Sequence, residues 1–450
     1  RLQQSQQMKE NEHMSITTNA ETLMDKLYEL AFQFKKAKLW YKMNDTQLFA
    51  VRHSDGSIGY CCVMGMMGQH RALAVYPGAE GLDSFRILSK NNVFAASIAE
   101  YIETPLSQNC VMCSLQNKDA LNQRELDEVH DYCSRHGLVL RGPKAHPQFE
   151  RFRPFHYPWR ITDANDQLHL LEAFEACLEV NTKEEEELEE IYGVIDRAPY
   201  DHDIPLLEKK NGSFEWKSIA LPKPQKKQYP SAEIQDEIAL AKLKKSKKTS
   251  NEWACDVLLY TNPICDEESD ENTPAGEYGY VSNPTQPPYF PFLLIVVDNQ
   301  TGMVMEAKAF GRPNDYAEIF ANELLRLAIN IGKPKRLLVC NERAYALLDK
   351  FAAQLGVKLT MEENITLLNE AESAFSDRFP NDDDDGNSVY FTADPVAELV
   401  AILNAPDMLS AMPDEIFDQL MEISQEPSRS DIFTDEVLLN MRRESQKRKK

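Results

Sequence analysis

Carboxylates at the ends of apolar runs are the residues of this 450-residue chain best suited to chemistry. Asp256 stands within the apolar run 254–260, and Asn341-Glu342 directly follows the run 336–340. Carboxylates on neighbouring strands can hold divalent metal ions, which orient a water or a hydroxyl for in-line attack on phosphorus. In one of two interpretations, Asp256, Asn341 and Glu342 form a metal site, with Mg²⁺ or Mn²⁺ as the metal.

The catalytic version of this site consists of Asp256, Glu342 and Glu370, with Glu363 as the alternative to Glu370. Asn341 argues against it, because an amide can coordinate a hard cation but contributes no charge, so metal affinity should fall sharply. In the structural interpretation, Glu342 begins a helix, where the helix dipole favours a carboxylate without any catalytic role. No cofactor is expected in that case.

The elements that position these residues are predicted in the order strand, strand, strand, helix, strand, helix, strand, helix. The predicted strands cover 254–260, 290–297, 303–310, 336–340 and 357–361, and the helices begin at 315, 343 and 365. A hairpin followed by alternating strands and helices indicates a mixed sheet covered by helices. The order resembles that of ribonuclease-H-like domains, including integrases and transposases. The resemblance implies one carboxylate on the first strand and one after the fourth, and so favours Asp256 and the 341–342 pair.

The chain divides by composition into a mixed α+β protein with two folded parts and several connecting segments. The predicted organisation is a disordered leader over 1–20, an N-terminal α+β domain over 21–220, a Pro/Lys-rich linker over 221–250, a ribonuclease-H-like domain over 251–376, an acidic linker over 377–392 and a helical tail with a basic disordered end over 393–450. Met14, rather than Met8, is the expected start of translation in a bacterial reading frame, and a peptide that begins before Ser15 would contradict this.

Within the first domain, helical spacing of apolar residues predicts helices near 23–34, from 81, over 122–135 and after 163. Strands are predicted over 47–52, 57–63, 71–76 and 110–115, and Asp55-Gly56 supplies the turn of the first hairpin. The run 183–190 is expected to be a solvated acidic helix.

Cysteines and histidines between 110 and 136 superficially resemble a zinc set. If 110–115 is a strand, Cys110 and Cys113 point to opposite faces and cannot converge on one ion. Buried free thiols and exposed imidazoles are therefore the expectation. Cys61-Cys62 is interpreted in the same way.

Two basic segments could contact nucleic acid. Between 141 and 160, arginines alternate with aromatic residues in an irregular extended segment, and Arg151, Arg153 and Trp159 are the candidate nucleic-acid ligands. The alternative is that the aromatics pack on a core. Five lysines between 242 and 248 could bind phosphate, or could form a solvated hinge.

The net charge of −23, from 49 Lys and Arg against 72 Asp and Glu, repels nucleic acid over most of the surface. The nine scattered cysteines fit reduced thiols in a cytoplasm, and no apolar run is long enough to span a membrane.

The chain after Met14 is similar to a family of uncharacterised bacterial two-domain proteins. The residues that carry the similarity are 48–51, 59–65, 72–76, Arg153-Pro154, Pro158-Trp159 and 341–348. The resemblance implies that Asp is commoner at position 341, and it implies no activity. A cytoplasmic binding protein, with a protein as the first expected partner and nucleic acid as the second, is therefore favoured. The alternative is a metal-dependent nuclease or a transposase-derived phosphoryl-transfer enzyme.

Overall fold

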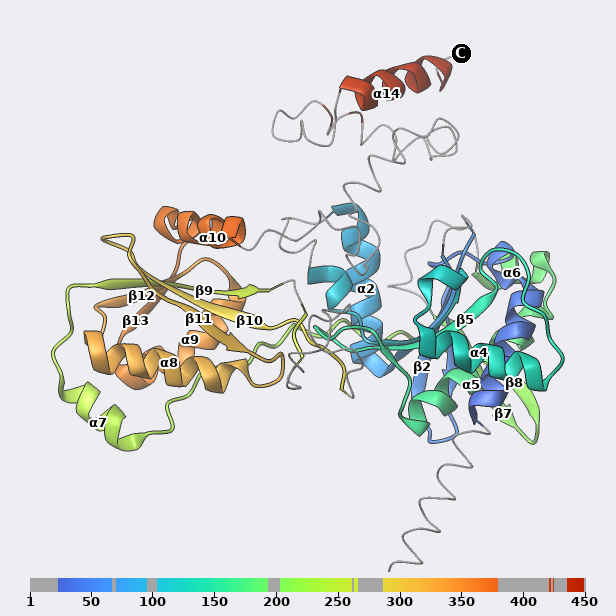
Figure 1. Ribbon diagram of the computed structural model, residues 1–450, viewed down its shortest axis with the longest axis horizontal. Helices are drawn as coiled ribbons and strands as arrows, with labels where there is room; N and C mark the ends of the chain where they lie inside the picture. The colour runs from blue at the N-terminus through green and yellow to red at the C-terminus, as the bar shows by residue number, and fades with distance from the viewer. Residues whose placement is uncertain are drawn as a thin grey trace, which may run out of the picture. The chain divides into compact units, whose positions relative to one another are not determined.

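The structure, a computed structural model, describes residues 23–66, 70–94, 103–192, 203–260, 263–265, 286–378, 421, 424 and 435–448. The chain forms two compact units, residues 1–381 and 382–450. The first unit contains two mixed sheets with helices packed against them, so the predicted α+β class is confirmed (Figure 1).

The first sheet has eight strands among the described residues, in the spatial order β6-β5-β4-β3-β2-β1-β7-β8. Their bounds are β1 Phe49–Arg52, β2 Ile58–Met64, β3 Arg71–Pro77, β4 Cys110–Gln116, β5 His146–Phe152, β6 Trp159–Arg160, β7 Ile204–Lys210 and β8 Ser213–Ile219. Neighbouring strands are antiparallel except for β1 and β7, which are parallel. The predicted hairpin is β1–β2, and Gly56 adopts the positive φ of 87° that the turn requires.

Helices cover both faces of this sheet. Their bounds are 23–37, η1 Leu39–Tyr41, α2 Gly78–Phe94, 103–106, η2 Lys118–Ala120, α4 Gln123–Arg135, α5 Ala164–Asn181 and α6 Glu185–Tyr192. Helix 23–37 and α5 bury Phe34 and Phe174 on one face, and α2 buries Leu82 and Phe85 on the other. The predicted helix starts are confirmed by side-chain caps, a capping box at Asn122 for α4 and Asp163 for α5.

Two parts of the first sheet differ from the prediction. The segment expected to be irregular contains β5, which pairs along its whole length with β4. Strands β7 and β8 were not predicted, and they form a hairpin whose turn is Asn211-Gly212.

The second sheet has the spatial order β11-β10-β9-β12-β13. Its strands are β9 Glu252–Leu259, β10 Phe292–Asp298, β11 Val304–Gly311, β12 Arg336–Val339 and β13 Lys358–Met361, and its helices are α7 Glu237–Lys245, α8 Tyr316–Ile331, α9 Glu342–Leu355 and α10 Thr366–Arg378. Strand β10 is antiparallel to β9 and β11, whereas β12 is parallel to β9 and β13. The element order predicted for this part of the chain is confirmed.

The side chains of β9 point alternately to the two faces of the second sheet. The hydrophobic core around this sheet therefore has two parts, one on each face. Trp253, Cys255 and Val257 face the helices α8 and α9, and Ala254 faces α10 with Leu368 (Figure 1). Residues two apart on a strand share a face, so Asp256 lies on the α10 side with Ala254.

The segment 221–250 was predicted to be a linker, and its second half packs on the second sheet's core. Ala232 and Ile234 are buried there, and the Ala232 N–H donates to the Leu347 carbonyl at 2.7 Å. Helix α7 follows and buries Leu243 in the same core. From about residue 232 onward, this segment is therefore part of the fold around the second sheet.

The predicted leader, nearly all of the acidic linker predicted over 377–392 and nearly all of the short helices predicted over 395–423 lie outside the described residues. The first two residues of that linker belong to α10. In the second unit, α14 spans Asp435–Arg448, so the predicted disordered end is wrong for Lys447 and Arg448. None of the helices in the described part of the chain is long and apolar enough to cross a membrane.

Candidate functional site

Asp256 is the buried carboxylate at the centre of the second sheet. It lies on β9 opposite Ile295 of β10, and its residue is 6% exposed. A charged group in such a place requires hydrogen-bond or ionic partners, because removing a carboxylate from water without them costs several kcal/mol. The partners that Asp256 has therefore determine what this position can do.

The first partner is Asn341, which lies between β12 and α9. Its side-chain oxygen accepts a hydrogen bond from the Ala344 N–H at 2.9 Å and so caps α9, while its amide nitrogen donates to Oδ1 of Asp256 at 2.6 Å. The cap fixes which end of the amide faces which neighbour, because only the oxygen can accept from a backbone N–H. Asn341 thus presents N–H, not a lone pair, to the carboxylate.

The second partner is Glu372 of α10, whose carboxyl group is hydrogen-bonded to that of Asp256. Burial, together with the Asp256 charge, raises the pKa of Glu372 to about 8. Burial also raises the pKa of Asp256, and hydrogen bonds from Asn341, from the Val257 N–H at 2.6 Å and from Glu372 oppose this rise. Asp256 accepts from three donors and Glu372 supplies one of them, so the proton shared by the two carboxyl groups lies on Glu372.

Of the residues predicted to form this site, the structure brings together Asp256 and Asn341. Glu342 is exposed in the first turn of α9, and Glu363 and Glu370 are exposed near α10. Glu370 instead lines an open hollow of about 450 Å³ with Asn364, Thr366, Asn369, Ser373 and Ala374. The missed residue is Glu372. It stands four positions after the buried Leu368, one turn along the same helical face, and that spacing was the available signal.

The donors at this site do not fit Mg²⁺ or Mn²⁺. Such ions require several oxygen lone pairs directed at one point. Here the first partner of Asp256, Asn341, presents an amide N–H to it rather than an oxygen lone pair. Among the described residues, no group of three or more His, Cys, Asp or Glu is placed to hold a metal ion.

In the basic-aromatic stretch, residues 141–160, the guanidinium group of Arg151 is bonded to neighbouring groups of the protein itself. Arg151 donates to the Cys110 carbonyl at 3.1 Å and to the Asn109 side chain at 2.8 Å, and its Nε lies 3.3 Å from Asp166. Burial lowers the pKa of Arg151. Arg153 is more exposed and lies 3.5 Å from the same Asp166. The guanidinium of Arg151 is therefore not free for phosphate.

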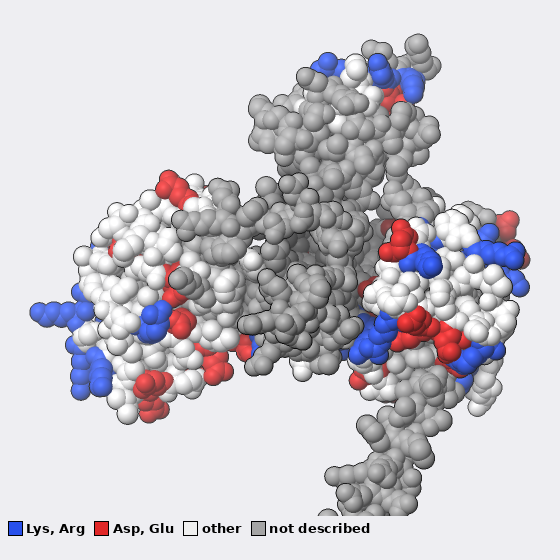
Figure 2. All heavy atoms as spheres, in the orientation of Figure 1, with Lys and Arg blue, Asp and Glu red and all other residues white. Residues whose placement is uncertain are grey.

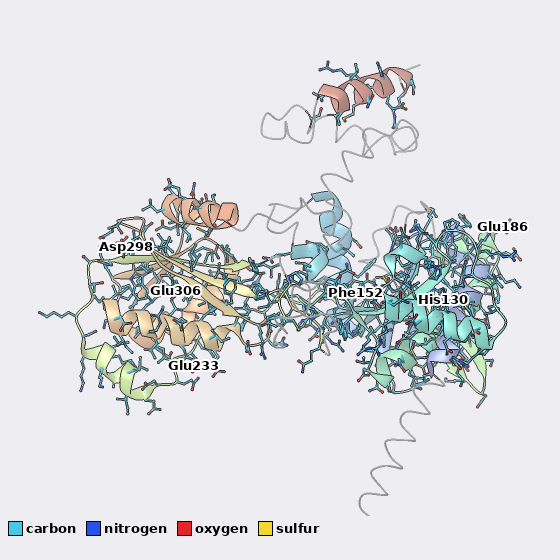
Figure 3. All side chains as sticks on the ribbon, viewed as in Figure 1. His130, Phe152, Glu186, Glu233, Asp298 and Glu306 are labelled. Atoms are coloured by element: carbon cyan, nitrogen blue, oxygen red, sulfur yellow. The ribbon has the colours of Figure 1, made fainter. Side chains whose placement is uncertain are left out.

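The aromatic residues of this stretch are mostly covered. Phe149 packs against Tyr28 in the first core, Phe152 packs on the opposite face of the sheet (Figure 3), and Phe155 contacts Phe292 of β10 with ring centroids 5.0 Å apart. Trp159 is half-buried on β6, with Arg160 beside it. Little aromatic surface remains for stacking bases.

The thiols of the proposed zinc set lie on opposite faces, as the strand interpretation predicted. Cys110 belongs to the core beneath α2 and Cys113 to the core beneath α5, and burial raises the pKa of Cys110 to about 12. His130 is exposed on α4 (Figure 3). All nine cysteines are free thiols, and Cys61 and Cys62 likewise face opposite cores.

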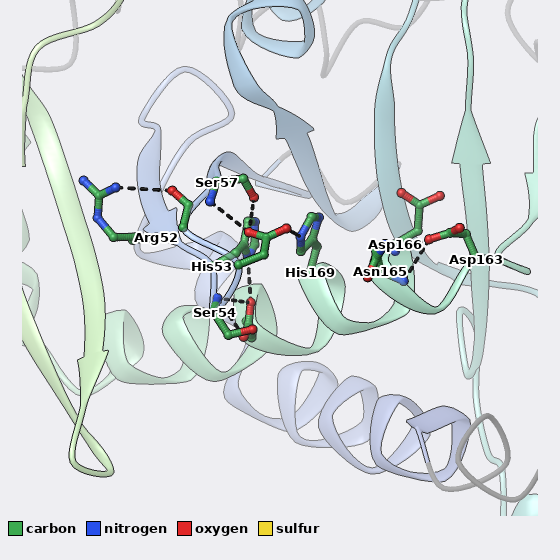
Figure 4. A network of polar contacts seen from close by, with 11 residues as sticks. Arg52, His53, Ser54, Ser57, Asp163, Asn165, Asp166 and His169 are labelled. Atoms are coloured by element: carbon green, nitrogen blue, oxygen red, sulfur yellow. Dashed lines mark hydrogen bonds and ion pairs between the residues drawn. The ribbon is translucent and has the colours of Figure 1, made fainter. Parts of the chain in front are cut away.

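A second polar cluster joins the β1–β2 turn to α5 (Figure 4). The rings of His53 and His169 stack with centroids 4.0 Å apart, and each bonds a carboxylate, Glu172 at 2.8 Å and Asp55 at 2.9 Å respectively. Hydrogen bonds from the Ser57 hydroxyl and N–H, and then from His169, lower the pKa of Asp55. Every carboxylate here has a local partner, so the cluster fixes the hairpin on the helix.

One further ion pair, which is partly buried, connects the 103–106 helix to α9 within the first unit. Arg343, in the first turn of α9, donates from both of its terminal nitrogens to the carboxylate of Glu103. The distance from Nη1 of Arg343 to Oε1 of Glu103 is 2.7 Å. The guanidinium also lies 4.8 Å from the ring centre of Phe292. The first turn of α9 thus contacts Asp256 through Asn341 and the 103–106 helix through Arg343.

Comparisons with known proteins agree with a two-domain organisation. A domain of unknown function (DUF7309) matches residues 25–196, and a second domain of unknown function (DUF6930) matches residues 239–376. A search of curated proteins found none that matches the chain.

Proposed function

Because the chain carries a DUF7309 domain followed by a DUF6930 domain, both of unknown function, we propose that it acts by binding rather than by catalysis. The observation that carries this proposal is the double role of Asn341, whose amide caps α9 and neutralises part of the Asp256 charge. A metal ion would have to displace that amide and remove the proton from Glu372. The position therefore works as a structural hydrogen-bond cluster.

The second sheet is, in this proposal, a ribonuclease-H-like scaffold. Its support is the order of three antiparallel strands followed by alternating helices and parallel strands, with Asp256 on the first strand and Asn341 after the fourth. A fold does not fix a function, and scaffolds of enzymes also serve as binding modules. The free thiols support a reducing compartment, which we take to be a bacterial cytoplasm.

A protein is the first partner that we propose for the surface of the first sheet. The candidate nucleic-acid ligands there have neighbours of their own: Arg151 and Arg153 share Asp166, and Trp159 is half-buried. This weakens the case for bases and phosphates at that surface. Co-purification from the native cell with an affinity-tagged full chain identifies the partner.

The competing function is metal-dependent phosphoryl transfer with Asp256 and Glu372. Its support is that two carboxyl groups with raised pKa values meet at one place, which is common at active sites. The test is cleavage of DNA and RNA in Mg²⁺ and in Mn²⁺ by the wild type and by Asp256→Ala, Glu372→Gln and the exposed control Glu370→Gln. We expect no cleavage by any of them. Cleavage that is lost with Asp256→Ala and Glu372→Gln, and kept with Glu370→Gln, would establish the enzyme.

A further inference from the structure

The segment 242–248 carries five lysines in seven positions, and all five side chains are exposed: Lys242, Lys244, Lys245, Lys247 and Lys248. It begins in the last turns of α7 and continues toward β9. Within the described part of the chain, none of the five makes an ion pair. Figure 2 shows Lys and Arg side chains gathered over α7 and the residues after it.

Some exposed lysines elsewhere in the described residues pair with carboxylates, and others, such as Lys26, Lys118 and Lys358, do not. The density of five exposed lysines in seven positions is what makes this segment distinctive. Lys209 bonds Glu175 at 2.7 Å, Lys210 bonds Glu215 at 3.0 Å, and Lys217 pairs with Glu208. In a chain with 72 acidic and 49 basic residues, carboxylates are abundant. Five neighbouring lysines without one form a local positive field on an acidic protein.

The segment is held in place rather than free. Leu243 is buried in the second core, and the Ser246 hydroxyl donates to its carbonyl at 2.7 Å. The Thr249 N–H donates to the Lys333 carbonyl at 2.8 Å. Lys333 is itself buried, and its ammonium group donates to the Lys244 carbonyl at 3.4 Å. The interpretation of this segment as a solvated hinge does not agree with these anchors.

We propose that the exposed lysines of residues 242–248 form a binding surface for the phosphate backbone of a nucleic acid. The density of the charge favours this partner. A nucleic acid presents closely and regularly spaced phosphates, which neighbouring lysine point charges can neutralise together. With no aromatic residue in the segment, binding is independent of sequence.

This surface is separate from the cluster around Asp256. The segment leads to Glu252 at the start of β9, which pairs with Arg336 at the start of β12, whereas Asn341 follows the end of β12. The inference therefore does not depend on the proposal that the Asp256 cluster lacks catalysis. If either proposal fails its test, the other is unaffected.

The test is fluorescence anisotropy of a labelled DNA duplex of about 20 base pairs, titrated with the full chain over a series of KCl concentrations. If all five lysines contact phosphate, the logarithm of the binding constant falls with the logarithm of salt at a slope of about −4.5. The variant Lys242→Gln/Lys245→Gln/Lys248→Gln should bind at least about 10-fold more weakly in low salt, with a slope near about −2.

The matched control is Lys209→Gln/Lys210→Gln/Lys217→Gln, which removes the same charge from the first sheet and should leave the slope unchanged. Circular dichroism verifies that both triple variants are folded. The inference is overturned if the wild type does not bind the duplex in 50 mM KCl, or if the segment variant binds with the wild-type slope. Tighter binding of polyglutamate than of DNA of equal charge also overturns it, in favour of an acidic protein partner.

Discussion

The amide nitrogen of Asn341 lies 2.6 Å from the carboxylate of Asp256, while the oxygen of the same amide caps α9. One side chain thus connects the central strand of the second sheet to the start of a helix. The contact uses the amide as a donor, so it stabilises a carboxylate without a cation. The hydrogen bond from Asn341 therefore opposes the rise in the pKa of Asp256 that burial causes.

Replacing Asn341 by Asp should destabilise the protein by about 2–4 kcal/mol, because it places a second charge beside Asp256. The helix cap is kept, since Asp is as good an N-cap residue as Asn. The control Asn341→Ser also keeps a cap and removes only the donor to Asp256, so its loss should be smaller. Urea denaturation measures both. Equal losses for Asp and Ser would contradict the proposed charge effect.

Glu372 should make the protein less stable as the pH rises. Its pKa is about 8 in the folded protein against 4.5 in the unfolded chain, so between these values the folded state holds a proton that the unfolded state releases. Stability therefore falls from pH 4.5 to 8. Glu372→Gln should remove this part of the fall, on the order of 2 kcal/mol.

The measurement for Glu372 is the urea midpoint at pH 5 and pH 8, compared among the wild type, Glu372→Gln and the exposed control Glu370→Gln. Glu150, whose pKa burial also raises to about 8, contributes a similar dependence that all three proteins share. An unchanged difference between the two pH values in Glu372→Gln would contradict the shared proton.

Arg151→Ala should lower stability and leave any binding of nucleic acid unchanged. The guanidinium bonds the Cys110 carbonyl and Asn109, and its removal leaves those buried acceptors unpaired, at a cost of about 2–3 kcal/mol. Arg153→Ala, at a more exposed position, should cost less than about 1 kcal/mol. Thermal denaturation measures the first effect and DNA anisotropy the second. A stable Arg151→Ala protein with weaker DNA binding would restore the nucleic-acid role of this stretch.

Arg343 and Glu103 should be energetically coupled. Arg343→Ala leaves a half-buried carboxylate without its partner, and we expect a loss of about 3 kcal/mol. A double-mutant cycle with Glu103→Gln should give a coupling of at least about 1 kcal/mol in urea denaturation. Arg343→Lys should not restore it, because lysine cannot make the two-pronged contact. If the two substitutions change the free energy of unfolding additively, the interaction between Arg343 and Glu103 does not stabilise the protein.

Local patterns in the sequence were sufficient to predict most of the second sheet. The turn at 298–302, the stop at Gly332 and the apolar runs of β9, β10 and β12 are all short-range signals, and their outcome agrees with the structure. The meeting of Asp256 with Asn341 was predicted from the resemblance to ribonuclease-H-like domains, and in the structure the parallel pairing of β9 with β12 brings the two residues together. Glu372 was not predicted because three glutamates occur between 363 and 372, and only the helical face that Glu372 shares with the buried Leu368 distinguishes it from the others.

The first sheet was less predictable for two different reasons. The β7–β8 hairpin has a clear local signal, Asn211-Gly212 with positive φ at both residues, and could have been predicted. The parallel pairing of β1 with β7 joins Ala50 to Leu206, and no local pattern encodes a contact over that distance. Strand β5 was mistaken for part of an irregular segment because of Pro154 and Pro158, but both lie after the end of the strand at Phe152. Pro147 lies near its first residue, where a missing N–H is tolerated.

The most direct test of the central claim, that the Asp256 cluster is closed without metal, is isothermal titration calorimetry of Mn²⁺ into the wild type and into Asn341→Asp. The account predicts no heat of binding for the wild type at millimolar Mn²⁺. Binding should appear in Asn341→Asp, where a carboxylate replaces the amide, and disappear again when Asp256→Ala is added. Binding of Mn²⁺ to the wild type that is lost with Asp256→Ala would contradict the account.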